Sequence, residues 1–363
     1  MTPADRPSPS AISLDRRHPV AKRVIASWRR LVGARSGDTG SEPTLIACSG
    51  GADSTALALA LASTGARLTL VFVRHGARPS ADVDLDRRIA SALAGAIGAE
   101  FIELDQVAAD GDSPSEATMR QNRYEALAAE ARRRGIRFVA TGHHADDQLE
   151  TVLLGLLRGS GPRGLAGMSA SRRVDDAEPP VALLRPMLDI DRTEIERLCR
   201  DFGVNPPGGD GLEWAEDRTN ADTRFLRNRI RHEVVPLLEE LQAGVASRVS
   251  RSAELLRQVA EVTRARVRVF DDHFGSDQGG ASRSWPRAEL RDLEPVEVGE
   301  LLRWIVEARF DRQGLDRLDS ASLMRIAAAI HDASTEPRRF ELGAGLEVTI
   351  LANDVAIARK SPA

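Results

Sequence analysis

The residues best suited to chemistry form a short glycine-rich run that follows an apolar segment. The run reads Ser-Gly-Gly-Ala-Asp-Ser, with the apolar residues Thr44 to Cys48 before it and a helix pattern after it. A turn from a strand into a helix directs free backbone N–H groups and the positive end of the helix dipole to one point. Glycine permits close approach of the backbone to a ligand, and serine hydroxyls bind phosphate oxygens. We therefore predict a phosphate site. Its members are Ser49, Gly50, Gly51, Ala52, Asp53 and Ser54.

The carboxylate of Asp53 is the unusual feature of this run, because it would repel a bound phosphate. A cation such as Mg²⁺ that bridges the carboxylate and the phosphate oxygens removes the repulsion. The alternative is that Asp53 caps the following helix. The run lacks the lysine of the G-x-x-x-x-G-K-[ST] loop and does not match G-x-G-x-x-G, so the two commonest nucleotide loops are excluded for it.

A second group of candidate residues lies in Thr141 to Leu165 (TGHHADDQLETVLLGLLRGSGPRGL), which opens at the end of a predicted strand. His143 and His144 fall at that strand end, where ligands of α/β sheets bind. Asp147 and Glu150 are three residues apart on the following helix, so both carboxylates share a face and can hold one ammonium group. The same D-x-x-E spacing is also a capping box, and adjacent histidines can simply satisfy backbone groups.

Arginine supplies nearly all of the positive charge. The net charge is -4, and lysine occurs only at Lys22 and Lys360. Arginines concentrate in residues 158–173, in residues 218–231 and on a long helix that bears Arg248, Arg251, Arg257, Arg264, Arg266 and Arg268. Such clusters bind nucleic-acid phosphates or form a solvated face. The candidates for RNA contacts are Arg158, Arg163, Arg218, Arg227, Arg229 and Arg231. Aromatic residues are only 4%, which disfavours a platform for stacked single-stranded bases.

The elements that position these residues alternate between strand and helix. Apolar strand patterns at 44–49, 67–73, 100–105 and 137–142 are each followed by a helix pattern, and 181–187 adds a further strand. This alternation predicts an α/β fold with a doubly wound, mainly parallel sheet. A helix at 18–32 precedes the sheet. After residue 244 the patterns predict long helices and then short terminal strands, which indicates a smaller, mainly helical second domain.

The chain has 363 residues, which is enough for two domains with separate cores. We predict a disordered segment at 1–18, a catalytic domain at 19–217, a basic connecting helix at 218–244 and a C-terminal domain at 245–363. Residues are 42% hydrophobic and 29% charged, which is typical of globular proteins. The first ten residues contain no apolar run, and we expect neither a signal peptide nor a membrane anchor. Two cysteines are too few for a disulfide framework, so we expect a cytoplasmic protein.

The run at 49–54 resembles the S-G-G-x-D-S signature of the PP-loop ATP pyrophosphatases, also called adenine nucleotide α-hydrolase-like proteins. Their fold is the one predicted above. The resemblance implies that the chain cleaves ATP between the α and β phosphates, releases pyrophosphate and adenylates an oxygen of its substrate.

Within that class, the sequence is similar to the tRNA(Ile)-lysidine synthetase family, in a short form. The matching segments run in order and together span Ser49 to about Leu238. They are SGGADS, VRHGARPSADVD, MRQNRYEAL, GHHADDQLETVLLGLLRGSGPRGLAGM, LLRPMLDIDRTEI and WAEDRTNADTRFLRNRIRHEVVPLL. The family joins free L-lysine to the wobble cytidine of the tRNA(Ile) that has a CAU anticodon, through an adenylated cytidine, and yields AMP and pyrophosphate.

The resemblance also implies roles for individual residues. Asp53 would hold Mg²⁺ and ATP, Arg123 and His143 would contact the ATP phosphates and act in catalysis, and Asp147 with Glu150 would bind lysine. The arginines named above would contact the tRNA, and a homodimer is compatible with the family. A nearby carboxylate or His143 would take the proton from the attacking amine.

The sequence departs from the family pattern at one place, and two alternative functions remain open. Family members often have an acidic or amide residue where this chain has Arg74 before His75 and Gly76, which affects the contacts expected for adenine. A tRNA thiolase of the same class would share the ATP loop but needs reactive cysteines, and Cys48 and Cys199 lie in core-like segments. A non-catalytic RNA-binding protein with the same fold is the other alternative.

Overall fold

The computed structural model describes residues 12–33, 42–74, 80–105, 116–216, 226–277, 282–310, 318–342 and 345–360. The chain divides into two compact units. The first comprises Met1–Thr151 and Met168–Arg251, and the second comprises Val152–Gly167 and Ser252–Ala363. The two segments of each unit are therefore distant in sequence, and each unit is described separately.

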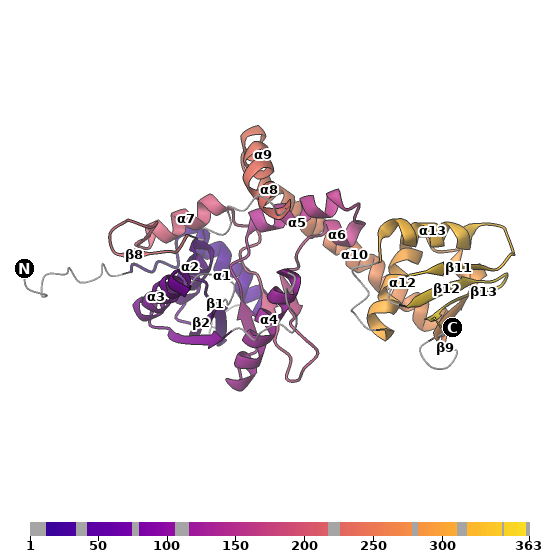
Figure 1. The fold of residues 1–363 in the computed structure, drawn as a ribbon, viewed down its shortest axis with the longest axis horizontal. Helices are drawn as coiled ribbons and strands as arrows, with labels where there is room; N and C mark the ends of the chain where they lie inside the picture. Colours follow the sequence, from indigo (N-terminus) through magenta and orange to yellow (C-terminus); the bar gives the residue numbers. More distant parts are fainter. Residues whose placement is uncertain are drawn as a thin grey trace, which may run out of the picture. The chain divides into compact units, whose positions relative to one another are not determined.

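The first unit is built on a six-stranded sheet of order β3-β2-β1-β4-β6-β5. Figure 1 labels two of its neighbouring strands, β1 and β2. All neighbouring strands pair in parallel except β5 and β6, which are antiparallel. The strands are β1 (Thr44–Ala47), β2 (Leu68–Arg74), β3 (Glu100–Asp105), β4 (Phe138–Ala140), β5 (Ser171–Arg173) and β6 (Ala182–Leu184). The predicted α/β class and the mainly parallel sheet are confirmed.

Helices cover both faces of this sheet because successive strand residues point to opposite sides. Ile46 and Leu70 belong to one apolar core, and their neighbours Leu45 and Val71 belong to another. The first core is completed by α1 (Pro19–Val32), α2 (Ala52–Ala62), α3 (Ser80–Ile97) and α7 (Arg192–Asp201), and the second by α4 (Glu116–Arg133). A short parallel pair, β7 (Val204–Asn205) and β8 (Leu212–Glu213), follows α7.

The segment 158–173 is not the exposed loop that its composition predicts. α5 (Ala145–Leu157) leads into the short helix α6 (Pro162–Leu165), and the segment ends in the edge strand β5. Pro162 lies at the start of α6, where its missing N–H costs nothing. β5 consists of Ser171, Arg172 and Arg173 and has no apolar residue, so its sequence gives no strand signal.

Residues 226–241 form a helical segment with an irregular centre. It consists of α8 (Leu226–Arg229), the π-helix η2 (Ile230–Val234) and α9 (Val235–Leu241). Pro236 lies in the first turn of α9 and has no N–H to donate to the carbonyl four residues earlier. In the wider turn before this proline, the N–H of Val235 donates to the carbonyl of Ile230, five residues earlier. The predicted connecting helix 218–244 is therefore interrupted in its described part, and residues 217–225 lie outside the described residues.

The second unit combines helices with an antiparallel sheet of order β11-β12-β13-β10-β9. Its helices are α10 (Val245–Phe274), which begins in the first unit, α11 (Arg287–Leu290), α12 (Pro295–Arg309) and α13 (Ser320–His331). The strands are β9 (Ser276–Asp277), β10 (Ser282–Pro286), β11 (Arg338–Glu341), β12 (Leu346–Ile350) and β13 (Asp354–Arg359). The predicted terminal strands are confirmed as β11 to β13.

The domain limits proposed from the sequence remain predictions. Residues 1–11 of the segment predicted to be disordered lie outside the described residues, and α1 begins at Pro19. The contact-defined units differ from a linear division, since Val152–Gly167 groups with the second unit. None of the helices in the described ranges is both long and apolar enough to cross a membrane.

Candidate active site

The turn between β1 and α2 has the conformation that an anion site requires. Gly50 has φ 85°, a left-handed value that favours glycine, and a Cβ there would lie 2.8 Å from the backbone oxygen of Asp86. Gly51 is the N-cap residue of α2. The Ser54 hydroxyl donates to the Gly51 carbonyl at 3.1 Å and lies 3.4 Å from the Ser49 hydroxyl. The loop is thus held with both hydroxyls beside the start of a helix.

Gly142, at the end of β4, brings a second backbone segment against this loop. A Cβ on Gly142 would lie 2.8 Å from the Asp53 carbonyl carbon and 2.9 Å from the Ser54 nitrogen. Both neighbours are backbone atoms and cannot rotate away. The loop and the segment that carries His143 and Asp147 are therefore in direct contact because position 142 has no side chain.

The Gly142→Ala variant is expected to lose ATP binding and about 1–3 kcal/mol of stability, because the added methyl group must push the two backbones apart. Isothermal calorimetry with ATP and a thermal unfolding curve measure the two effects. Gly95→Ala is the matched control, since Gly95 lies within α3 and a Cβ there would meet no atom within 4 Å. Normal ATP affinity in Gly142→Ala would contradict the assigned close contact.

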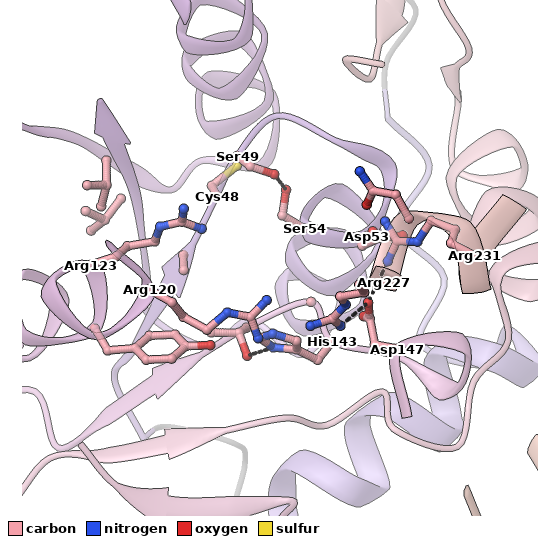
Figure 2. A pocket seen from close by; sticks show the side chains of 17 residues that line it. Cys48, Ser49, Asp53, Ser54, Arg120, Arg123, His143, Asp147, Arg227 and Arg231 are labelled. Carbon is pink, nitrogen blue, oxygen red and sulfur yellow. Dashed lines mark hydrogen bonds and ion pairs between the residues drawn. The ribbon is translucent and has the colours of Figure 1, made fainter. Parts of the chain in front are cut away.

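A cavity of 310 Å³ opens beside the loop, and its wall is polar and charged. Ser49, Asp53 and Ser54 line it from the loop, and Arg120 and Arg123 line it from α4 (Figure 2). His143 and Asp147 contribute from the start of α5, and Arg227 and Arg231 from α8 and η2. The candidate residues of four separate segments therefore meet in one cavity, at the carboxyl end of the parallel strands.

Asp53 lies in the first turn of α2 rather than at its N-cap, so the capping alternative is wrong. Its Oδ1 atom is buried and makes no hydrogen bond within the described residues. Burial raises the pKa of Asp53, and the nearby His144 opposes that rise. The Asp53 side chain is 36% exposed and lines the phosphate-sized cavity, so its carboxylate fits a bound cation. The described residues contain no cluster of three or more metal-ligating side chains, so phosphate and water would complete the coordination.

His144 links the loop to α5 by charge. Its Nε2 lies 3.6 Å from Asp53 Oδ1 and 3.6 Å from Asp147 Oδ2, and its Nδ1 lies 3.2 Å from Asp146 Oδ2. Burial lowers the pKa of His144, but Asp147, Asp53 and Asp146 together raise it to about 10. The ring is therefore an imidazolium at neutral pH. Sequence reasoning did not assign this role, although the acidic pair that follows the histidine was a signal for it.

His143 has the opposite character. Burial lowers the pKa of His143 to about 3, so the ring is neutral at neutral pH. Its Nδ1 lies 2.8 Å from the hydroxyl of Thr141, which fixes the ring orientation. The neutral ring can form hydrogen bonds in the cavity but adds no charge to it.

Asp147 and Glu150 are paired with two arginines. Arg231 Nε donates to Glu150 Oε1 at 2.5 Å, and Arg231 Nη2 donates to Asp147 Oδ1 at 3.0 Å. Arg227 Nε donates to Glu150 Oε2 at 2.8 Å, and its Nη2 lies 3.5 Å from Asp147 Oδ1. The side chain of Glu150 is only 1% exposed, so removal of both partners would leave a buried charge. Figure 2 shows both guanidinium groups directed at Asp147.

Asp147 also stabilises the start of α5, from the third position of that helix rather than as its N-cap residue. Its Oδ2 accepts a hydrogen bond from the backbone N–H of His144 at 3.2 Å, just before α5. Burial alone would raise the pKa of Asp147, but the imidazolium of His144 and the two arginines hold it well below its usual range. One oxygen thus caps the helix while the other faces the arginines. The capping box of Asp147 with Glu150 is therefore wrong, since Asp147 lies inside α5 and the oxygens of Glu150 accept from Arg231 and Arg227.

Arg120 is a cavity residue that sequence reasoning missed. It precedes Arg123 by three residues on α4, so both share one face of the helix and both line the cavity. The spacing within MRQNRYEAL was therefore a signal for a pair. Together the two side chains place two positive charges opposite the loop.

The other arginines predicted to bind RNA differ in exposure. Arg158 is exposed, and Arg229 is 57% exposed and pairs with Glu233 at 3.4 Å. Arg163 pairs with Glu307 at 2.6 Å and with Glu300 at 3.4 Å, within the second unit. Arg218 lies outside the described residues.

The long helix α10 carries further arginines with partners inside the second unit. Arg264 pairs with Glu307 at 2.6 Å, and Arg266 pairs with Glu297 at 2.9 Å. These two arginines of α10 are therefore already paired with acidic side chains.

The two cysteines are both free and buried. Burial raises the pKa of both thiols, and Cys199 donates a hydrogen bond to the carbonyl of Ala52. Buried thiols with raised pKa values are poor nucleophiles. This environment disfavours the sulfur-transfer alternative.

Three proteins of similar sequence are all tRNA(Ile)-lysidine synthases. The model of the PP-loop domain family matches residues 23–238. The tRNA(Ile)-lysidine synthase of Salinispora arenicola is 41% identical over 225 residues, which is 59% of this chain and 62% of that protein. That of Ralstonia nicotianae is 33% identical over 84% of this chain and 67% of that protein. That of Bordetella bronchiseptica is 35% identical over 77% of this chain and 80% of that protein. The chain thus spans under two thirds of the Salinispora relative.

Among solved structures, the U34-tRNA thiolase from Methanococcus maripaludis, solved with its 4Fe-4S cluster, matches with a TM-score of 0.51 and 16% sequence identity. The match covers 66% of this chain and 81% of that one. At this identity the likeness shows a common fold and nothing about the reaction.

Proposed function

The chain belongs to the tRNA(Ile)-lysidine synthase family of PP-loop proteins, and we propose on that basis that it joins free L-lysine to the wobble cytidine of CAU-anticodon tRNA(Ile). ATP would be cleaved to AMP and pyrophosphate. The observation that carries the proposal is one cavity lined by both the PP-loop and Asp147, whose carboxylate shares Arg231 with the buried Glu150 behind it. A phosphate site and an ammonium site are the two subsites that this ligation needs.

The ATP subsite consists of the loop residues 49–54 with Arg123 and His143. Backbone N–H groups at the start of α2 and the hydroxyls of Ser49 and Ser54 suit the phosphate oxygens. Asp53 would hold a Mg²⁺ ion, which neutralises charge on the phosphates when it is bound. Neutral His143, oriented by the Thr141 hydroxyl through Nδ1, would offer its other ring nitrogen, Nε2, for a hydrogen bond to the ligand.

The reaction requires two displacements. In the first, the carbonyl oxygen of cytosine attacks the α phosphorus and pyrophosphate leaves. In the second, an uncharged amine of lysine attacks the same ring carbon, AMP leaves with the oxygen, and the amine loses a proton. Arg123 and the loop N–H groups would stabilise the negative charge that develops on the phosphates. Lysine has two amino groups, so Asp147 and Glu150 can hold one as ammonium while the other attacks.

The tRNA would contact the exposed arginines. Arg158 and Arg229 are available in the described residues, and we extend the proposal to Arg218 because of its sequence position. Arg163, Arg227 and Arg231 have acidic partners that RNA phosphates would have to replace. Because the substrate is tRNA, we place the reaction in the cytoplasm.

The proposal is tested with purified protein, ATP, Mg²⁺, labelled lysine and the CAU-anticodon tRNA(Ile) transcript. We expect lysine to enter the RNA with one AMP released per lysine. A transcript with the wobble cytidine replaced by uridine is the control and should accept none. Absence of label in the RNA, with a known lysidine synthase active under the same conditions, would refute the proposal. Transfer of sulfur from a persulfide donor would favour the thiolase alternative.

A further inference from the structure

The ammonium subsite of the proposed function already contains two cations. Asp147 and Glu150 carry two negative charges, and Arg227 and Arg231 carry two positive ones. The imidazolium of His144 lies 3.6 Å from Asp147, and a lysine ammonium group would add a further cation to these two buried carboxylates. Like charges at this distance repel, and the cavity wall screens them less than water does. Lysine can therefore bind well only if one guanidinium leaves.

The geometry indicates which arginine is held less firmly. Arg231 donates hydrogen bonds to both carboxylates, at 2.5 Å to Glu150 and at 3.0 Å to Asp147. Arg227 donates to Glu150 alone at 2.8 Å, and its 3.5 Å contact with Asp147 is an ion pair without a hydrogen bond. Arg227 has fewer bonds to lose.

An alternative partner for Arg227 lies in the same cavity. Arg227 lines the cavity together with Ser49 and Ser54 of the phosphate loop. A guanidinium binds phosphate through two parallel hydrogen bonds, an arrangement as favourable as its carboxylate contact. A phosphate group bound in the cavity therefore competes with Glu150 for this side chain.

We propose that Arg227 holds the place of the substrate ammonium group in the ligand-free chain and moves to a bound phosphate, which opens the carboxylate pair to lysine. The proposal rests on the proposed function. Under this proposal, lysine binds tightly only when a phosphate group is already bound in the cavity. The phosphate comes either from ATP or from the tRNA backbone.

Equilibrium dialysis of labelled lysine against the full-length protein tests this coupling. Three samples are compared: protein alone, protein with Mg²⁺ and α,β-methylene-ATP, and protein with the tRNA transcript. We expect the Kd for lysine to fall about 10-fold in the sample that supplies the phosphate, a typical size for coupling between two ligands. The sample that shows the fall identifies ATP or tRNA as the source. An equal Kd in all three samples would overturn the proposal without any variant.

The variants separate the place-holding role from a purely structural one. Arg227→Gln should bind lysine without phosphate about as tightly as the wild type binds it with phosphate, which removes the coupling. Arg227→Lys keeps a cation beside Glu150 and should keep the coupling. Arg197→Gln, on the exposed side of α7, is the control and should match the wild type. Thermal unfolding of each variant confirms that it is folded.

The outcomes distinguish this inference from the proposed function. Weaker lysine binding by folded Arg227→Gln in the absence of phosphate would show that Arg227 supports the subsite rather than blocks it. Lysine binding that is tight and independent of phosphate would overturn the inference and leave the proposed function intact. Failure of the wild type to bind lysine in any sample would remove both.

Discussion

Asp53→Asn is expected to reduce tRNA-dependent exchange of pyrophosphate into ATP by about 10³-fold, the loss typical when charge stabilisation of a transition state is removed. The change keeps the shape of the side chain and removes the negative charge whose Oδ1 is buried without a hydrogen bond in the described residues. The same carboxylate lines the cavity and is the candidate contact for Mg²⁺ beside the phosphates. Exchange of labelled pyrophosphate, measured over a range of Mg²⁺ concentrations, reports the effect on adenylation alone.

A matched control distinguishes this role from a general effect on a helix start. Asp82 is an acidic residue in the first turn of α3, a helix that packs on the same sheet as α2. The Asp82→Asn variant should leave pyrophosphate exchange unchanged. Normal exchange in Asp53→Asn would show that the carboxylate serves only the charge balance with His144. A reduced melting temperature with normal exchange would support the same conclusion.

Asp147→Asn is expected to reduce kcat/KM for lysine by about 10²-fold and to spare pyrophosphate exchange, because a charge-assisted bond to an ammonium group is worth about 1.5–3 kcal/mol. The asparagine oxygen can still accept the hydrogen bond from the His144 N–H, so the cap on α5 is retained. The measurement is lysine incorporation at varied lysine concentration, beside exchange in the same preparation.

Asp147→Ala separates the two functions of this residue, because it removes both the charge and the cap. Its loss of lysine use should be similar to that of the asparagine variant, with an additional loss of about 1 kcal/mol of stability. An asparagine variant with normal lysine use, beside an impaired alanine variant, would assign Asp147 to capping alone. Equal loss of incorporation and exchange in both variants would move Asp147 to the ATP subsite.

The fold could be predicted where the signal was local. β1, β2 and β4 are short apolar runs and β3 mixes polar and apolar residues; each is followed by a helix of more than two turns, and this order is visible without any long-range information. β5 and β9 have two or three residues and are defined by their partners rather than by their own pattern. The π-helix before Pro236 could not be predicted, because a proline leaves no periodic pattern in the turn that precedes it.

The site could be predicted only one segment at a time. The loop, the histidines and the carboxylates each have a recognisable spacing, and the structure brings the loop and Asp147 to one cavity. The pairing of Glu150 with Arg227 and Arg231 joins residues 77 and 81 positions apart. Local spacing carries no information about such contacts. Sequence reasoning therefore assigned the carboxylates to lysine and the arginines to RNA as if the two groups were separate.

The long separation between Glu150 and its arginines has a consequence for synthesis of the chain on the ribosome. All six strands of the first sheet have been synthesised once Leu184 is translated. Arg227 and Arg231 are added more than 40 residues later. Until then the carboxylate of Glu150 lacks its two guanidinium partners, and a buried charge without them costs about 3–5 kcal/mol. The nascent sheet can form early, whereas the catalytic cavity closes only when the segment after the sheet has been made.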